Sequence, residues 1–205
     1  MKKIGLFFGT YNPIHVGHLV IANHIANYTE LDEVWLVVSP QNPLKKKASL
    51  LEDYHRLALV RVAIDENPKL KASDIEFDLP QPSYTSNTLV HIHEKYPDYS
   101  FAIIMGEDNL RTFHKWKNYE EILKNNRIYV YPRVLTEQEK EGIKNNERED
   151  SAIHNHKNVI LCNDVPVMNI SASFIRTAIK EKKDVSYLLT QPVFKYLTEM
   201  HFYEK

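Results

Sequence analysis

The sequence lacks the features that mark several large classes of protein. Its single cysteine, Cys162, cannot form a disulfide within the chain, which favours a reducing compartment. The apolar stretch near the start stops at Gly9, too soon for a signal peptide, and no apolar run approaches the roughly 20 residues that cross a bilayer. With 26 Lys and Arg against 27 Asp and Glu, the net charge of −1 creates no field that attracts nucleic acid. We therefore expect a cytoplasmic protein that binds neither membranes nor nucleic acids.

Two common nucleotide-binding signatures are also absent, the Gly-Lys-Ser/Thr phosphate loop and the G-x-G-x-x-G dinucleotide motif. In their place, residues 9–18 read GTYNPIHVGH, directly after the apolar run 4–8 and before a stretch with helical periodicity. A strand that leads into a helix aims backbone N–H groups and the positive end of the helix dipole at one point, which suits a phosphate. His15 and His18 lie three residues apart, so both can face that point. We call residues 9–18 the first phosphate loop.

The two histidines have other interpretations. His-x-x-His is also a spacing of metal ligands, although no third histidine, cysteine or aspartate stands nearby in the sequence to complete a set. The side chains could also be surface histidines without a task. Their positions on both sides of Gly17, at a strand-to-helix turn, favour phosphate binding over both alternatives.

Hydrophobic periodicity predicts an α/β fold. Continuous apolar runs indicate strands of a parallel sheet buried on both faces, at residues 4–8, 33–38, 72–77, 101–105, 127–131 and 159–162. Amphipathic stretches indicate helices at 19–26, 51–64, 88–94, 171–180 and 193–200, with Tyr54 in the core and Arg56 on the surface. The alternation predicts a Rossmann-like, doubly wound parallel sheet with helices on both faces. We expect one domain, 1–205, with a charged surface insertion at 136–150 and a helical C-terminal part at 170–205.

Basic side chains occur at two further places where an anion could bind. Lys45 and its two lysine neighbours lie in a loop after a predicted strand, and they are either phosphate contacts or solvated side chains. Ser171 is a good N-cap for the helix that follows it, and Arg176, one turn later, can swing back to an anion at that N-terminus. We call residues 170–176 the second phosphate loop.

Two more polar segments border predicted helices, and each has two interpretations. The hydroxyls and aromatic ring of Ser83, Tyr84 and Thr85 are either ordinary N-caps or ligand contacts. Gly106 and Asp108 follow a buried strand, where a ribose or magnesium contact and a simple N-cap are both open.

The first phosphate loop closely resembles the G-T-F-D-P-x-H-x-G-H signature of the nucleotidyltransferases of the His-x-Gly-His superfamily. Residues 170–176 are similar to I-S-S-T-x-I-R, the other signature of this superfamily. Three further segments are similar, in order, to motifs of its nicotinate-nucleotide adenylyltransferases: the last three residues of P-P-H-K at 43–45, G-P-S-Y-T-x-D-T-L at 81–89, and G-A-D-N-L with a later tryptophan at 106–116. The chain departs from these motifs at Phe8, Asn12, Leu44, Gln81, Asn87 and Ala172.

This resemblance implies transfer of the adenylyl group of ATP to nicotinate mononucleotide, with Mg²⁺ accompanying ATP. It implies catalytic roles for His15, His18, Lys45 and Arg176. It places the ATP site at Gly9, Thr10, His18, Gly106, Asp108, Ser171 and Arg176. It places the mononucleotide site at Ser83, Tyr84, Thr85 and Trp116, although the pattern alone puts Trp116 in the core. An oligomer is compatible with the sequence, and the alternatives are a pantetheine-phosphate adenylyltransferase and a nucleotide sensor without turnover.

Overall fold

The computed structural model describes residues 1–40, 50–133 and 152–204. Six strands form its sheet: β1 (Lys2–Gly9), β2 (Glu33–Val38), β3 (Leu70–Ser73), β4 (Tyr99–Gly106), β5 (Arg127–Tyr131) and β6 (Val159–Leu161). The α-helices are α1 (Val16–Tyr28), α2 (Asp53–Ile64), α3 (Thr85–Lys95), α4 (Glu107–Arg111), α5 (Tyr119–Asn125), α8 (Ala172–Lys180) and α9 (Gln191–Glu199). Two short 3-10 helices are η1 (Phe113–Lys115) and η2 (Ser186–Leu188).

The sheet is parallel throughout, in the order β3-β2-β1-β4-β5-β6. The chain therefore moves from β1 towards one edge of the sheet through β2 and β3, then returns to the other side of β1 with β4. The loops that follow β1 and β4 leave the same edge at this change of direction, which is where open α/β sheets bind ligands. The doubly wound prediction is confirmed.

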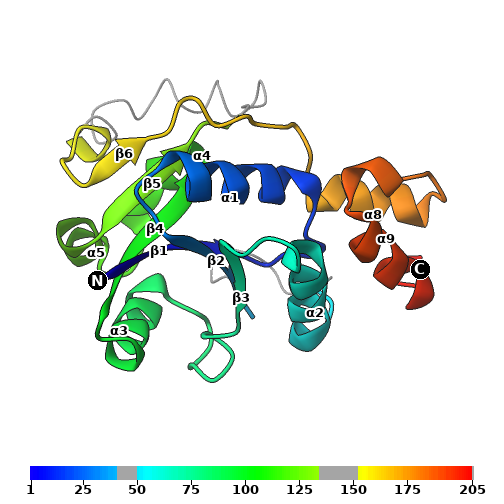
Figure 1. Cartoon of the computed structure of the whole chain (residues 1–205), viewed down its shortest axis with the longest axis horizontal. Coiled ribbons are helices and arrows are strands. Elements are labelled where there is room, and N and C mark those ends of the chain that lie inside the picture. Colours follow the sequence, from blue (N-terminus) through cyan, green and yellow to red (C-terminus); the bar gives the residue numbers. More distant parts are fainter. Residues whose placement is uncertain (41–49, 134–151, 205) are drawn as a thin grey trace.

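Hydrophobic side chains form two clusters, one on each face of the sheet. The first cluster joins Phe7 and Leu36 to side chains of α1, α2, α8 and α9, such as Ile25 and Ile175. The second joins the alternate strand positions, such as Leu6, to side chains of α3, α4 and α5. Successive residues of a strand point to opposite faces, which explains why β1 supplies both clusters. Figure 1 shows the helices lying on the two sides of the sheet.

Two sequence predictions were wrong in detail. The strand expected at 72–77 lies earlier, at Leu70–Ser73, because the chain turns immediately afterwards and Phe77 donates its N–H to the carbonyl of Asp74 over 2.8 Å. In α2 the expected orientations are reversed: the Tyr54 residue is 62% exposed, whereas Arg56 is fully buried. The charged segment predicted at 136–150 lies outside the described residues.

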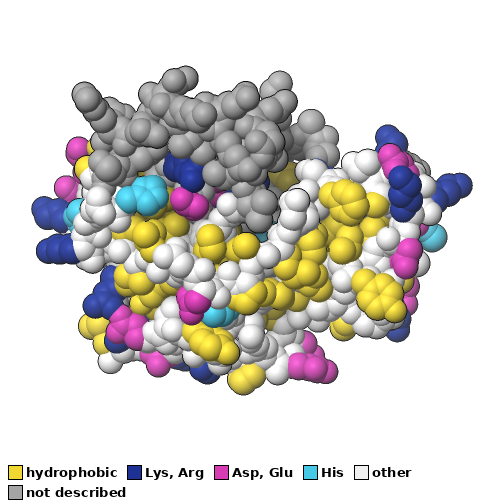
Figure 2. All heavy atoms as spheres, turned by 90° about the horizontal axis from the view of Figure 1, so that it is seen from above, with side chains coloured by type: hydrophobic (Ala, Val, Ile, Leu, Met, Phe, Trp, Pro, Cys, Tyr) yellow, Lys and Arg dark blue, Asp and Glu magenta, His cyan; other side chains and the backbone are white. Residues whose placement is uncertain are grey.

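The C-terminal helices form the part of the molecule at the right of Figure 1, next to α2. Helix α9 packs against α2, and Val193 and Leu197 join the first hydrophobic cluster. Large hydrophobic side chains remain exposed in this part of the chain, among them Phe174 and Tyr187. In Figure 2 these helices are again at the right, where hydrophobic side chains gather and charged side chains lie mainly around the rim. Within the described ranges, every helix is too short or too polar to cross a membrane.

Candidate functional site

The first phosphate loop connects β1 to α1 at the carboxyl edge of the sheet. Tyr11 adopts a left-handed backbone conformation, with φ 45°, and its ring folds back over Gly9. A Cβ atom at Gly9 would come 2.8 Å from that ring, so only glycine fits there. The Tyr11 hydroxyl donates to the carbonyl of Phe7, which fixes the fold of the loop. Gly9 therefore leaves the room that the ring of Tyr11 needs to pack here.

His15 and His18 stand side by side at the start of α1. His15 is the N-cap residue, its backbone N–H donates to Nδ1 of His18 over 3.3 Å, and the two imidazole rings stack with centroids 3.7 Å apart. A Cβ atom at Gly17 would come 3.1 Å from Nδ1 of His15, so this glycine leaves room for the imidazole. The two histidines therefore act as one unit at the N-terminus of the helix.

Burial gives His15 a distinct electrostatic character. The residue is 5% exposed, and this burial lowers the pKa of its imidazole to about 4. Its Nδ1 atom is buried without a hydrogen-bond partner among the described residues. At neutral pH the ring of His15 is therefore uncharged, and it can offer a phosphate an N–H donor but not a positive charge.

The second phosphate loop meets the first one in space. Ser171 is the N-cap of α8, as predicted, and its Oγ accepts from the N–H of Phe174 over 3.1 Å. Arg176 donates from one guanidinium nitrogen to the carbonyl of Asn12 over 2.7 Å and from the other to Oγ of Ser173 over 3.1 Å. Two motifs 164 residues apart in the sequence thus come together at the carboxyl edge of β1.

Asn12 forms hydrogen bonds with three distant segments of the chain. From the sequence it was identified only as a departure from the family motif. Its side-chain Oδ1 accepts from the N–H of Leu51 over 3.1 Å and from the hydroxyl of Tyr203 over 2.6 Å, while its carbonyl accepts from Arg176. The residue is 2% exposed. An amide oxygen without charge serves both donors, so asparagine at this position supports the first phosphate loop from within the protein.

Arg56 was missed as a member of the site, because the sequence placed it on the surface. Its guanidinium donates to the carbonyls of Thr10 (2.6 Å), Ser39 (2.9 Å) and Leu51 (3.0 Å), and it forms an ion pair with Asp53. These contacts hold together the loops that follow β1 and β2. Helical spacing could have indicated that Arg56 is buried, because Leu59 and Val60, three and four residues later, lie on the same face of α2 and are also fully buried.

The predicted Gly106 is the last residue of β4, and Asp108 lies in the first turn of α4, which follows directly. A Cβ atom at Gly106 would come 2.5 Å from Oδ1 of Asp108, so the carboxylate folds directly over the glycine. Asp108 forms an ion pair with Arg133, and no side-chain hydrogen bond caps α4. The simple N-cap interpretation is therefore wrong for Asp108. Because β4 lies beside β1, this carboxylate belongs to the same edge as the first phosphate loop.

The predicted mononucleotide segment is rich in polar atoms that lack partners. The N-cap of α3 is Tyr84, and no side chain caps the helix. The hydroxyls of Ser83 and Ser86 and the indole Nε1 of Trp116 are buried without hydrogen-bond partners among the described residues. The interpretation of Ser83 and Thr85 as N-caps is therefore wrong, because neither side chain caps the helix. These atoms are available for a ligand.

A cation–π contact joins the start of α3 to the chain near Trp116. The ammonium of Lys117 lies 4.9 Å from the centre of the Tyr84 ring, which joins the start of α3 to the chain just after Trp116. The indole of Trp116 is half-buried and packs against Phe113, with ring centroids 5.3 Å apart. Trp116 is therefore partly a core residue, as the pattern alone suggested, with its remaining surface exposed near the start of α3.

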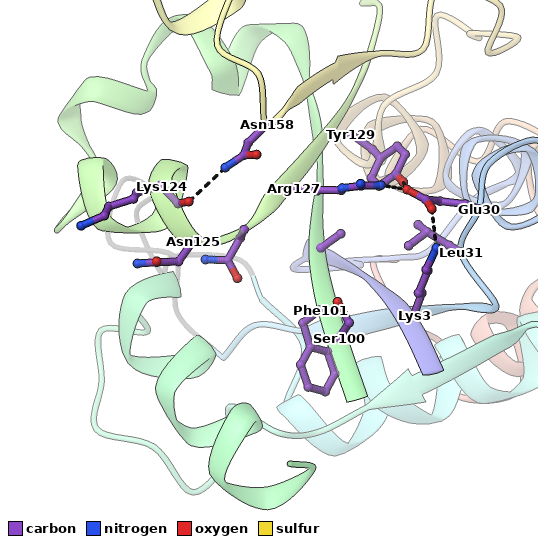
Figure 3. Close-up of a pocket in the computed structure, with 12 residues that line it drawn as sticks. Lys3, Glu30, Leu31, Ser100, Phe101, Lys124, Asn125, Arg127, Tyr129 and Asn158 are labelled. Carbon is purple, nitrogen blue, oxygen red and sulfur yellow. Dashed lines mark hydrogen bonds and ion pairs between the residues drawn. The ribbon is translucent and has the colours of Figure 1, made fainter. Parts of the chain in front are cut away.

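Two features remain. Lys45 falls outside the described residues. A cavity of about 370 Å³ lies at the amino ends of the strands, at the opposite edge of the sheet from the loops above. In Figure 3, the side chains of Lys3, Arg127 and Tyr129 point toward Glu30 in this cavity, where ion pairs and a hydrogen bond join them. This network ties β1 and β5 to the segment before β2, and the cavity contains none of the predicted site residues.

Comparisons with known proteins agree with this arrangement. A model of the cytidylyltransferase-like family matches residues 6–178. Relatives from Flavobacterium psychrophilum and Flavobacterium johnsoniae, each named probable nicotinate-nucleotide adenylyltransferase, are 54% identical over 203 residues, covering 99% of this chain and 100% of theirs. The structure of Plasmodium falciparum nicotinic acid mononucleotide adenylyltransferase complexed with NaAD is similar with a TM-score of 0.78 at 20% identity, covering 100% of this chain and 98% of that one. The chain belongs to the cytidylyltransferase-like family and, within it, to the nicotinate-nucleotide adenylyltransferases.

Proposed function

We propose that the protein transfers the adenylyl group of ATP to nicotinate mononucleotide, releasing pyrophosphate. A phosphate oxygen of the mononucleotide attacks the α-phosphorus of ATP and forms a new P–O bond. The bond from that phosphorus to the oxygen shared with the β-phosphate breaks, and pyrophosphate leaves with the electron pair. The product is nicotinate adenine dinucleotide, a precursor of NAD.

One observation carries this proposal: Arg176 of the second phosphate loop donates to the backbone of the first loop, three residues before His15. This contact brings a guanidinium, two imidazoles and the N-terminus of α1 to one place. Such a group of donors suits the negative charge that develops on the α-phosphate and on pyrophosphate. In this assignment His18 and Arg176 face the triphosphate, and His15 supplies a neutral N–H donor. Lys45 is proposed as a further phosphate contact from the resemblance.

The remaining predicted residues divide between the two substrates. Gly9, Thr10, Gly106, Asp108 and Ser171 are proposed to border ATP. The donors near Ser83, Thr85 and Trp116 are proposed to receive the pyridine ring and its carboxylate, because they are buried and lack partners in the described structure. Tyr84 forms the edge of this region, next to Lys117.

We propose that Mg²⁺ enters as its complex with ATP, because phosphate oxygens are ligands that this ion prefers. The described residues contain no group of three or more His, Cys, Asp or Glu side chains able to hold a metal ion. The protein's own contribution is to orient the phosphates and the attacking oxygen.

A single assay tests the proposed function. Pyrophosphate release from ATP is measured with nicotinate mononucleotide, nicotinamide mononucleotide and phosphopantetheine in turn, with and without EDTA. We expect turnover with nicotinate mononucleotide and its loss in EDTA. Turnover with phosphopantetheine alone would assign the chain to the other adenylyltransferase, and ATP binding without any turnover would assign it as a sensor.

A further inference from the structure

Glu76 is a buried acid that the proposed mechanism does not use. It lies in the turn after β3 and is 1% exposed. Its Oε1 atom accepts from the hydroxyl of Thr88 over 2.6 Å, and Thr88 is itself fully buried in the first turns of α3. Its Oε2 atom is buried without a hydrogen-bond partner among the described residues. Placing a carboxyl group here is costly, so its presence calls for a reason beyond filling space.

The residues around Glu76 connect the first phosphate loop to the start of α3. The hydroxyls of Thr88, Ser39 and Ser83 favour the charged form of the carboxyl, although burial outweighs them and raises its pKa overall. Ser39 is held in turn by the first phosphate loop, since its N–H donates to Gly9 and its carbonyl accepts from Arg56. Glu76 therefore lies where the loops after β2 and β3 meet the start of α3.

The position of Thr88 shows what the contact controls. Its backbone N–H and that of Asn87 donate to the carbonyl of Tyr84, so the first turn of α3 begins there. The N–H groups of Thr85 and Ser86 precede the helical hydrogen bonds and point beyond the N-terminus. Fixing Thr88 fixes the direction of these N–H groups, and the nearby Ser83 hydroxyl also acts on the Glu76 carboxyl.

We propose that Glu76 is a positioning residue for the mononucleotide: by holding Thr88, it aims the start of α3 at the carboxylate of the pyridine ring. This inference rests on the proposed function, since it takes nicotinate mononucleotide as the ligand of that segment. In this proposal Glu76 contacts neither substrate, and it affects the binding of nicotinate mononucleotide but not of ATP.

The test compares KM for the two substrates. Glu76→Ala removes the nearer acceptor of the Thr88 hydroxyl and leaves the carbonyl of Tyr84, at 3.3 Å. We expect KM for nicotinate mononucleotide to rise about tenfold while KM for ATP stays within about twofold of wild type. Thr88→Val removes the donor at constant shape and should reproduce this change. The double variant should be no worse than either single one, because the two side chains act through one contact. Glu76→Gln keeps an acceptor oxygen and should restore KM.

Glu33 supplies a matched control. It is also a buried glutamate, 8% exposed, but it lies at the start of β2, at the opposite edge of the sheet. Glu33→Ala should lower the melting temperature and leave both KM values unchanged. The inference would be overturned if Thr88→Val raised both KM values equally, or if neither Glu76→Ala nor Thr88→Val raised KM for nicotinate mononucleotide. If Glu76→Ala does not fold, the result for Thr88→Val alone tests the inference. A wild-type protein that does not use nicotinate mononucleotide would instead overturn the proposed function.

Discussion

The two histidines of the first phosphate loop differ although they share one helical turn. His15 is buried and has a pKa lowered to about 4, so it is neutral in the free protein at pH 7. His18 packs edge-on against the ring of Tyr11, with centroids 5.2 Å apart, and stacks on His15. A phosphate bound at the end of α1 would therefore meet an N–H donor backed by a second imidazole.

We expect His18→Ala to lower kcat about a hundredfold, because losing one donor aimed at transition-state charge costs on the order of 2.7–4 kcal/mol. The melting temperature should change little. His24→Ala is the matched control, since His24 lies on the same helix and pairs with Asp164, away from the loop. Steady-state kinetics of both variants check this, and wild-type turnover in His18→Ala would remove the side chain from the mechanism.

Arg176→Lys should not be conservative. The guanidinium binds the carbonyl of Asn12 and the hydroxyl of Ser173 with two different nitrogens, and a planar fork can also grip two phosphate oxygens, which an ammonium cannot. We expect kcat/KM with ATP varied to fall by at least about tenfold, a loss of about 1.4 kcal/mol. Arg127→Lys, at an exposed ion pair with Glu30 at the opposite edge of the sheet, is the comparison. Equal kinetics for Arg176→Lys and wild type would contradict the assignment of the second phosphate loop.

Glu76 and Glu33, two buried glutamates at opposite edges of the sheet, should change the stability of the fold in opposite directions as the pH rises. Burial raises the pKa of Glu76; at Glu33 burial acts in the same direction, but hydrogen bonds from Lys2, Trp35 and Lys71 outweigh it and lower the pKa. Stability contributed by Glu76 is present below the unfolded pKa, about 4.5, and is lost as pH rises through the folded-state pKa. Stability contributed by Glu33 is present above about 4.5 and is lost as pH falls through its lowered pKa.

Glutamine variants separate these two contributions. Relative to wild type, Glu76→Gln should gain stability as pH is raised from about 4 to 8, and Glu33→Gln should lose it over the same range. Urea unfolding at several pH values measures both differences. A constant difference between Glu76→Gln and wild type at all pH values would show that the Glu76 carboxyl has an ordinary pKa.

At the scale of elements, α2 acts as a clamp on two loops. Its fully buried Arg56 binds three backbone carbonyls and Asp53. We expect Arg56→Met to lower the free energy of unfolding by on the order of 3–5 kcal/mol, since it leaves buried acceptors and a carboxylate without their donor. Arg61→Met, one turn later on the exposed side of the helix, should cost less than about 1 kcal/mol. Chemical denaturation of the two variants tests the difference, and similar losses would contradict the clamp.

Most elements were predictable because buried parallel strands appear as continuous apolar runs. β2 and β5 begin and end where the sequence placed them, and the doubly wound order followed from the alternation of strands and helices. β3 was displaced because its end depends on a turn held by backbone contacts, which leave no periodic signal. Helical spacing could have placed Arg56 on the buried face of α2, but the partners of Arg56 and Glu76 were not predictable for a related reason. A charged residue is buried only where distant segments supply partners, and one sequence does not show which segments meet.

At the scale of the whole molecule, the proposed site of the pyridine ring combines parts of the chain that lie far apart in the sequence. A carboxylate accepts hydrogen bonds only, and the buried atoms near Ser83 and Trp116 include hydroxyl and indole donors. The amide of nicotinamide mononucleotide would oppose one of these with its own donor, at a cost of about 1–3 kcal/mol. We expect kcat/KM to favour nicotinate mononucleotide by about ten- to a hundredfold.

Trp116→Ala should raise KM for the mononucleotide and leave KM for ATP nearly unchanged, because the indole offers a face for stacking on the pyridine ring. Trp35→Phe is the control, since Trp35 lies in β2 and donates to Glu33 at the opposite edge of the sheet. A defect of Trp116→Ala confined to ATP would show that the pocket is assigned to the wrong substrate.

The hydrogen bond from Tyr203 to Asn12 has a consequence for how the protein is made. The two residues are 191 positions apart, and a ribosome adding about 5–20 residues per second needs roughly 10–40 s to produce the second after the first. Throughout that interval Asn12 lacks its partner Tyr203, and for most of it the loop also lacks Arg176, which is made 164 residues after Asn12. The proposed phosphate-binding surface is therefore completed only after residue 203 has been made, and a nascent chain that already has its sheet order cannot yet have its finished site.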